Sequence, residues 1–131
     1  MNIELKEIDK DTLKVGDVVG IARPVRIGWY SQFRHMRVVP VKIVRITPKR
    51  TKIETDQFGE HDKNEIFYEY DENAEKENEL AIMFEQFKDG RYALEDFDKK
   101  YGLDLIDDED IQNMAYHMKA IMEIIEKYGK E

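Results

Sequence analysis

The longest β-prone run of the chain is Met36-Arg37-Val38-Val39-Pro40-Val41-Lys42-Ile43-Val44-Arg45-Ile46-Thr47. Its apolar residues alternate with polar ones, as in a half-buried strand, but the alternation changes phase twice. Such changes are typical of a bulge or of a strand bent across a small barrel. Pro40 cannot donate a hydrogen bond to a neighbouring strand, which also favours a bulge or an edge position. We therefore expect a curved strand here.

Shorter β-prone segments surround this run. A strand of Val18, Val19 and Ile21 follows the turn residues Gly16 and Asp17, and residues 51–55 and 66–70 are expected to form two further strands. The polar segment 56–64, with Gly59 at its centre, is expected to be a loop. Short strands joined by tight turns predict a curved N-terminal antiparallel sheet or an SH3-like small barrel.

From Asp71 the apolar period becomes helical. We expect a helix capped within residues 71–73 and ended by Asp89-Gly90, then a short helix closed by Gly102, then a last helix capped by Asp107. The predicted fold class is α+β, with two or three C-terminal helices after the sheet. Residues 1–70 form a β-rich basic part and residues 71–131 an acidic helical part packed on it, as one compact domain.

The charges are divided along the chain. Residues 1–54 hold 12 Lys/Arg and 6 Asp/Glu, whereas residues 55–131 hold 9 and 23, so the net charges are +6 and −14 and the whole chain carries −8. No acidic residue lies between Asp17 and Glu54. A division of this kind indicates either two surfaces with different partners or one surface that neutralises the other.

Several function classes find no support in the sequence. There is no Cys, hence no disulfide or thiolate site, and Ser31 is the only serine. The three histidines lie far apart in the sequence, and adjacent residues such as Glu60-His61-Asp62 rarely converge on one ion. No apolar run is long enough to cross a bilayer, and the N-terminus lacks the apolar region of a signal peptide. We expect a cytoplasmic protein that is not an enzyme, with no cofactor, no metal and no membrane partner.

One segment combines arginines with aromatic rings. Guanidinium groups pair with phosphates or carboxylates, and flat rings stack on bases or fill protein pockets, so the segment is a candidate surface for a protein partner or a nucleic acid. A signalling nucleotide would suit the same chemistry. The alternative places Trp29 and Phe33 in the core, with the arginines facing acidic helices of the same molecule. The candidate residues are Arg23, Arg26, Trp29, Tyr30, Phe33, Arg34 and Arg37.

The helical half offers two further candidates. Asp71, Glu72, Glu75 and Glu79 could form an acidic contact face that mimics the phosphates of DNA. The alternative is an ordinary helix N-terminus, where carboxylates favour the positive end of the helix dipole. The last helix carries an apolar stripe that includes Met114, Met118 and Met122. This stripe could pack in the core or form the seam of a homodimer.

Three segments carry a resemblance to a known family. They are the strand–turn–strand 41–53, the strand-to-helix passage 66–75 and the closing helix 108–127, which together cover about two-thirds of the chain. In these segments and in its order of elements, the chain resembles a family of uncharacterised accessory proteins encoded by phages of Gram-positive bacteria. The resemblance implies a small, non-essential phage gene expressed inside a bacterial host. Such genes are often inhibitors of host defence systems, including CRISPR nucleases.

The function expected from these observations is binding. The first expectation is a non-enzymatic phage-type accessory protein, anti-CRISPR-like, that inhibits a host defence protein or nuclease through the basic aromatic segment and the acidic face. The alternative is a nucleic-acid-binding module that uses the basic aromatic face of a small β-barrel directly. A third possibility is a scaffold that oligomerises through the last helix. The chain is expected to be a monomer or a homodimer.

Overall fold

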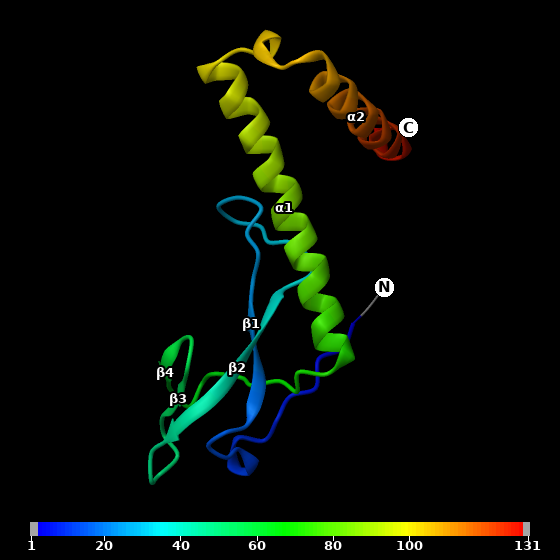
Figure 1. The fold of residues 1–131 in the computed structure, drawn as a ribbon. Helices are drawn as coiled ribbons and strands as arrows, with labels where there is room; N and C mark the ends of the chain where they lie inside the picture. Colours follow the sequence, from blue (N-terminus) through cyan, green and yellow to red (C-terminus); the bar gives the residue numbers. More distant parts are fainter. Residues whose placement is uncertain (1–2, 130–131) are drawn as a thin grey trace. The chain divides into compact units, whose positions relative to one another are not determined.

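The long β-prone run forms the strand β2, Arg37–Ile46, in the computed structural model, which describes residues 3–129. Four strands make one antiparallel sheet in the order β1-β2-β3-β4, with β1 at Val18–Arg23, β3 at Ile53–Thr55 and β4 at Gly59–His61 (Figure 1). Two α-helices follow, α1 at Glu72–Lys100 and α2 at Asp108–Gly129. The predicted α+β fold, an N-terminal antiparallel sheet followed by C-terminal helices, is confirmed.

The irregularity predicted for the long strand is present. The pairing of β2 with β3 shifts register between Ile43 and Arg45. Pro40 lies opposite Gly20 of β1, whose own N–H and C=O bond instead to Tyr68 at 2.7 and 2.9 Å. The backbone nitrogen of Pro40 therefore faces away from β1. On that other side of β2, pairing with β3 begins only at Ile43, so Pro40 has no strand beside it that would need an N–H donor. Proline is tolerated here because no ladder hydrogen bond is lost.

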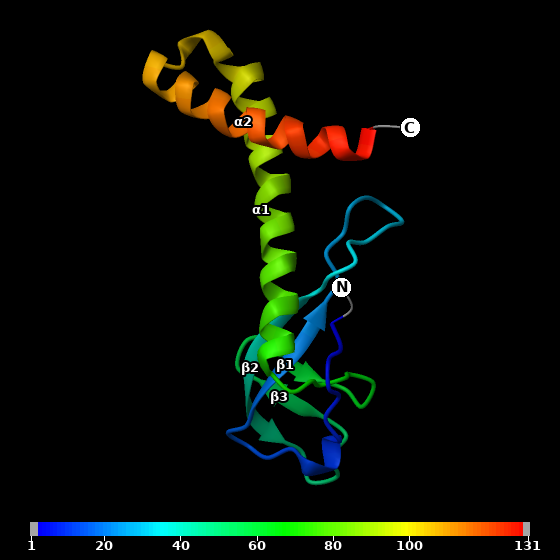
Figure 2. The same cartoon turned by 90° about the vertical axis from the view of Figure 1, so that its right-hand side faces the viewer.

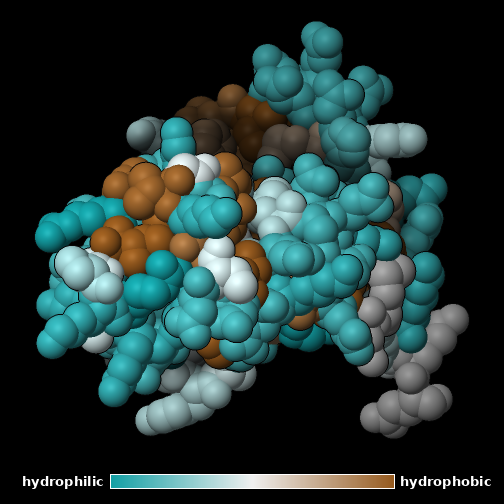
Figure 3. All heavy atoms as spheres, turned by 90° about the horizontal axis from the view of Figure 1, so that it is seen from below, coloured by the Kyte–Doolittle hydropathy of each residue, from teal (hydrophilic) through white to brown (hydrophobic). Residues whose placement is uncertain are grey.

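The core of the sheet consists of aliphatic side chains from its longer strands and one aromatic ring. Gly20 is required where β1 lies close to β2, because a Cβ atom there would lie 2.8 Å from Cγ1 of Val38. Polar side chains cover most of the face seen in Figure 3, and hydrophobic ones gather mainly at its left and, farther from the viewer, at its top. The buried cluster comprises Leu13, Val19, Ile21, Val41, Ile43, Ile53 and Phe67.

Two sequence predictions in this region are wrong. Residues 66–70 do not form a regular strand, and Tyr68 makes only isolated bridges, to Glu7 and Gly20. Conversely, the expected loop 56–64 contains β4, which pairs with β3 as a tight hairpin from Thr55↔Gly59 to Ile53↔His61. Gly59 allows this turn because its φ of +73° is readily accessible to glycine.

The helix expected to end at Asp89-Gly90 continues to Lys100, so the part of the chain that the structure describes, residues 3–129, contains two α-helices and not the separate short helix. A glycine inside a helix weakens it by only about 1 kcal/mol relative to alanine, which the helix-forming residues on either side can offset. The predicted N-caps are confirmed. Asp71 accepts a hydrogen bond from the N–H of Ala74, and Asp107 accepts one from that of Asp110, both at 2.9 Å. A short 3₁₀ turn, Leu103–Leu105, separates the two helices.

The chain divides into two compact units, one ending at Lys88 and the other beginning at Asp89. The division falls inside α1, beside Gly90, and not at the change from strand to helix near residue 71. The first turns of α1 therefore belong to the same unit as the sheet. The packing of the whole segment 71–131 on the β-rich part stays a prediction. Within residues 3–129, no helix is long and apolar enough to cross a membrane.

Replacing Gly90 by alanine should raise the free energy of unfolding by about 0.5–1 kcal/mol, because Gly90 lies in a helix interior and a Cβ atom there would contact nothing within 4 Å. Gly59→Ala is the matched control and should lower stability, because that position has a positive φ. Urea denaturation followed by circular dichroism measures both variants. A Gly90→Ala variant that is less stable than the wild type would contradict a continuous α1.

Candidate binding surface at the loop between β1 and β2

The loop 24–36, which joins β1 to β2, extends beyond the sheet as an ordered hairpin (Figure 2). Its two sides are held by the N–H of Phe33, which donates to the carbonyl of Val25 at 2.7 Å, and by a bridge between Arg26 and Gln32. At its end, the N–H of Ile27 donates to the carbonyl of Ser31 at 3.0 Å. We call residues 24–36 the tip loop.

The base of the tip loop is fixed to α1 by two polar side chains of the helix. Glu77, which is buried, accepts a hydrogen bond from Nδ1 of His35 at 2.7 Å and one from the N–H of Met36 at 2.8 Å. At the next residue of α1, the amide oxygen of Asn78 accepts a hydrogen bond from the N–H of Val38 at 3.0 Å and one from Nε of Arg37 at 2.9 Å. Burial of a carboxylate, an imidazole or a backbone N–H without a hydrogen-bond partner would cost free energy. Here the carboxylate of Glu77 and its two donors satisfy one another, so all three groups can be buried at this contact.

Further along α1, aromatic and basic side chains continue the same contact. The rings of Phe33 and Phe84 stack at 4.0 Å between centroids and 6° between planes. Lys88 donates from Nζ to the carbonyl of Arg26 at 2.7 Å. The helix residues involved, at positions 77, 84 and 88, are spaced by seven and four and therefore share one face of α1. The tip loop is braced along most of its length.

The braced loop presents two aromatic side chains to solvent. Trp29 is 90% exposed and Tyr30 is 101% exposed. Arg26 and Arg34 are also exposed and make no ion pair with any residue that the structure describes. Arg34 lies 4.9 Å from the centroid of the Phe33 ring. Four of the seven candidate residues from the sequence thus lie exposed on one loop.

The other three candidate residues are engaged within the molecule. Arg23 forms an ion pair with Glu65 at 2.7 Å, and Arg37 forms one with Glu85 at 3.4 Å in addition to its bond with Asn78. Phe33 is half-buried against Phe84. The alternative from the sequence is therefore correct in facing some arginines toward carboxylates, but it is wrong in placing Trp29 in the core.

The candidate acidic face lies at the start of α1. Asp71 caps the helix, while Glu72, Glu75 and Glu79 are exposed and spaced by three and four residues, so they form one solvent-facing row. This row differs from the face of α1 that carries the buried Glu77. Its position within the first turns agrees with a favourable interaction with the helix dipole, which accounts for the row without a partner.

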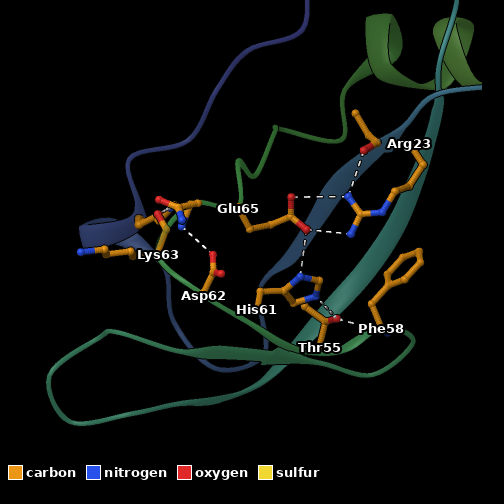
Figure 4. A network of polar contacts seen from close by, with 10 residues as sticks. Arg23, Thr55, Phe58, His61, Asp62, Lys63 and Glu65 are labelled. Atoms are coloured by element: carbon orange, nitrogen blue, oxygen red, sulfur yellow. Dashed lines mark hydrogen bonds and ion pairs between the residues drawn. The ribbon is translucent and has the colours of Figure 1, made fainter. Parts of the chain in front are cut away.

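A polar network holds the β3–β4 hairpin against the end of β1 (Figure 4). Glu65 contacts both Arg23, at 2.7 Å, and Nδ1 of His61, at 2.9 Å, while Nε2 of His61 lies 2.9 Å from the hydroxyl of Thr55. Because Glu65 accepts the proton of Nδ1, Nε2 is free to accept one from Thr55. This hydroxyl–imidazole–carboxylate chain has the order of a catalytic triad, but Thr55 is buried and offers no accessible nucleophile. We assign the network to stability.

The contacts in this network lower the pKa of Glu65. Burial acts to raise the pKa of the Glu65 carboxyl, but the hydrogen bonds from Arg23 and His61 and the positive charge of Arg23 outweigh it, so the pKa falls below its ordinary value of 4.5. The neighbouring Glu60 and Asp62 do not join His61 around a common point. Among the described residues, no group of three His, Cys, Asp or Glu could hold a metal ion.

The comparisons with known proteins give no relative. No protein-family model, no curated protein and no solved structure matches this chain.

Sequence reasoning missed the bracing residues Glu77, Asn78 and Lys88. They lie at the face of α1 that also carries Ala74, Ala81 and Phe84, and polar side chains on a covered face do not contribute to the apolar periodicity from which that face is predicted. A helical row of hydrogen-bonding side chains, opposite the acidic row, was the available signal. The network of Thr55, His61 and Glu65 depends on the β3–β4 hairpin, which the sequence did not predict.

Glu77→Gln should lower the free energy of unfolding by about 2–3 kcal/mol, because it weakens a charge-assisted bond to His35 and introduces a buried amide donor. The control is Glu79→Gln, two residues further along α1 on the exposed row, which should change the free energy of unfolding by less than about 0.5 kcal/mol. Chemical denaturation of both variants measures the difference. Equal effects would contradict a bracing role for Glu77.

The lowered pKa of Glu65 predicts an acid-sensitive contribution to stability. The folded protein holds the charged form more strongly than the unfolded chain does, so the contribution is complete above about pH 4.5 and is lost as the pH falls through the folded pKa. Glu65→Gln should therefore be less stable than the wild type at pH 7, and the gap should narrow below pH 4. Urea titrations at pH 7 and pH 3.5 test this, and a gap that is constant with pH would contradict it.

Proposed function

We propose that this chain is a non-enzymatic binding protein and that the tip loop is its contact surface for a protein partner. The observation that carries the proposal is the complete exposure of Trp29 and Tyr30 on a loop that is braced by hydrogen bonds to α1. Large aromatic side chains left in water represent apolar area that binding would bury, and such exposure marks interaction sites.

The residue types favour a protein partner. Tryptophan, tyrosine and arginine are the side chains most enriched among those that dominate binding energy at protein interfaces, and the tip loop presents all three in Trp29, Tyr30 and the unpaired Arg26 and Arg34. The bracing by α1 reduces the conformational entropy lost on binding. The unit up to Lys88 is close to neutral, with 15 Lys/Arg and 17 Asp/Glu, so it has little net charge to attract nucleic acid from a distance.

The identity of the partner is proposed from the resemblance to accessory proteins of phages of Gram-positive bacteria. On that basis the partner is a host defence effector, such as a CRISPR nuclease, in the cytoplasm of the bacterial host, and binding inhibits it. The row of Glu72, Glu75 and Glu79 would supply a second contact, to basic residues of the effector that normally bind phosphates.

Trp29→Ala combined with Tyr30→Ala should abolish co-purification of the partner from host lysate and should remove protection of phages in a plaque assay against the defence system. The folded stability should be unchanged, because both side chains make almost no contact in the free protein. Tyr92→Ala, an exposed tyrosine in the other unit, is the matched control. Retention of the partner by the double variant would contradict the proposal.

A second candidate function is binding of single-stranded nucleic acid. It is favoured by one observation: two adjacent exposed rings lie on the same loop as two unpaired arginines, a combination suited to base stacking and phosphate contact. Fluorescence anisotropy of labelled single-stranded and duplex oligonucleotides, titrated with salt, tests it. Saturable binding that weakens with salt and is lost in Arg26→Ala/Arg34→Ala would support this candidate, whereas no binding at low salt would exclude it.

A further inference from the structure

The second unit exposes an apolar helix face. No residue of α2 is buried, although its sequence carries the apolar stripe that is predicted to pack in the core or to form the seam of a homodimer. Met114 and Ile121 are half-buried, while Met122 is 58% and Tyr128 82% exposed. A helix with one apolar and one polar face normally buries the apolar one.

An open groove lies beside this stripe. It has a volume of about 830 Å³ and separates the last turns of α1, through Leu94 and Phe97, from α2, through Met114, Met118 and Ile121. All of its lining residues belong to the unit that begins at Asp89. A groove between two helices, lined mainly by apolar side chains, has the shape that a further helix fills in a helical bundle.

The exposed apolar area is of the size that a dimer needs. Taking about 200 Å² for a large side chain, the exposed parts of the six side chains below amount to roughly 700 Å². A standard interface buries about 800 Å² per partner, and the half-buried groove residues add to the total. The six are Leu105, Ile111, Met118, Met122, Ile125 and Tyr128.

A two-fold interface brings the same surface of both copies together, so the apolar stripe of one copy would cover the stripe of the other.

We propose that this face binds a second copy of the chain, with the apolar stripes of the two α2 helices in contact about a two-fold axis. The helix pairs of the two copies then share one apolar core. The tip loop lies in the other unit, so dimerisation would present two copies of the partner-binding surface, and it does not depend on the function proposed for that loop.

Light scattering coupled to size exclusion tests the proposal on the full chain at several concentrations. The wild type should show twice the monomer mass at high concentration, and Met118→Glu/Met122→Glu should be a monomer with unchanged helix content. Tyr116→Glu is the matched control, because Tyr116 is exposed on the opposite side of α2, and it should remain a dimer.

The proposal is overturned by a monomer at all concentrations or by a dimer that Met118→Glu/Met122→Glu leaves intact. A monomeric wild type destabilised by Met118→Glu/Met122→Glu would assign the stripe to packing within one chain.

Discussion

The buried carboxylate of Glu77 fixes the candidate binding surface. It accepts one bond from His35 and one from the backbone of Met36, at the point where the tip loop passes into β2. A buried carboxylate without donors would cost free energy, so these two bonds hold the start of α1 against the base of the loop. The stacking of Phe33 on Phe84 and the bond from Lys88 to Arg26 extend the same contact toward the tip. The loop that these contacts brace carries Trp29 and Tyr30 exposed at its end.

The tip loop and the apolar stripe of α2 belong to different units of the chain. The first unit contains a true core and a single prominent loop, whereas the second contains two helices whose apolar side chains are largely exposed. Gly90 lies next to the division, inside a helix that continues through it. An amphipathic helix gains most of its stability from packing of its apolar face, so the second unit has a physical reason to associate.

Much of the fold was predictable from particular residues. The alternating Val39, Val41 and Ile43 predicted the long strand, and the changes of phase on either side of them predicted the irregular register. Asp71 and Asp107 predicted the starts of the two helices, because a carboxylate before a helical period satisfies free backbone donors. The β4 strand and the continuity of α1 were not predicted. In both cases a glycine indicated a break, but Gly59 forms the turn of a hairpin and Gly90 is accommodated in a helix.

The sequence by itself determined the division of charge, the aromatic and basic character of residues 24–36 and the apolar stripe of the last helix, because composition and periodicity are local properties. Only the tertiary structure decided which arginines are free. Arg23 and Arg37 meet Glu65 and Glu85, which lie more than 40 positions away, whereas Arg26 and Arg34 meet no carboxylate in the described chain. Whether a charge is paired depends on which distant segment folds against it, and no local pattern contains that information.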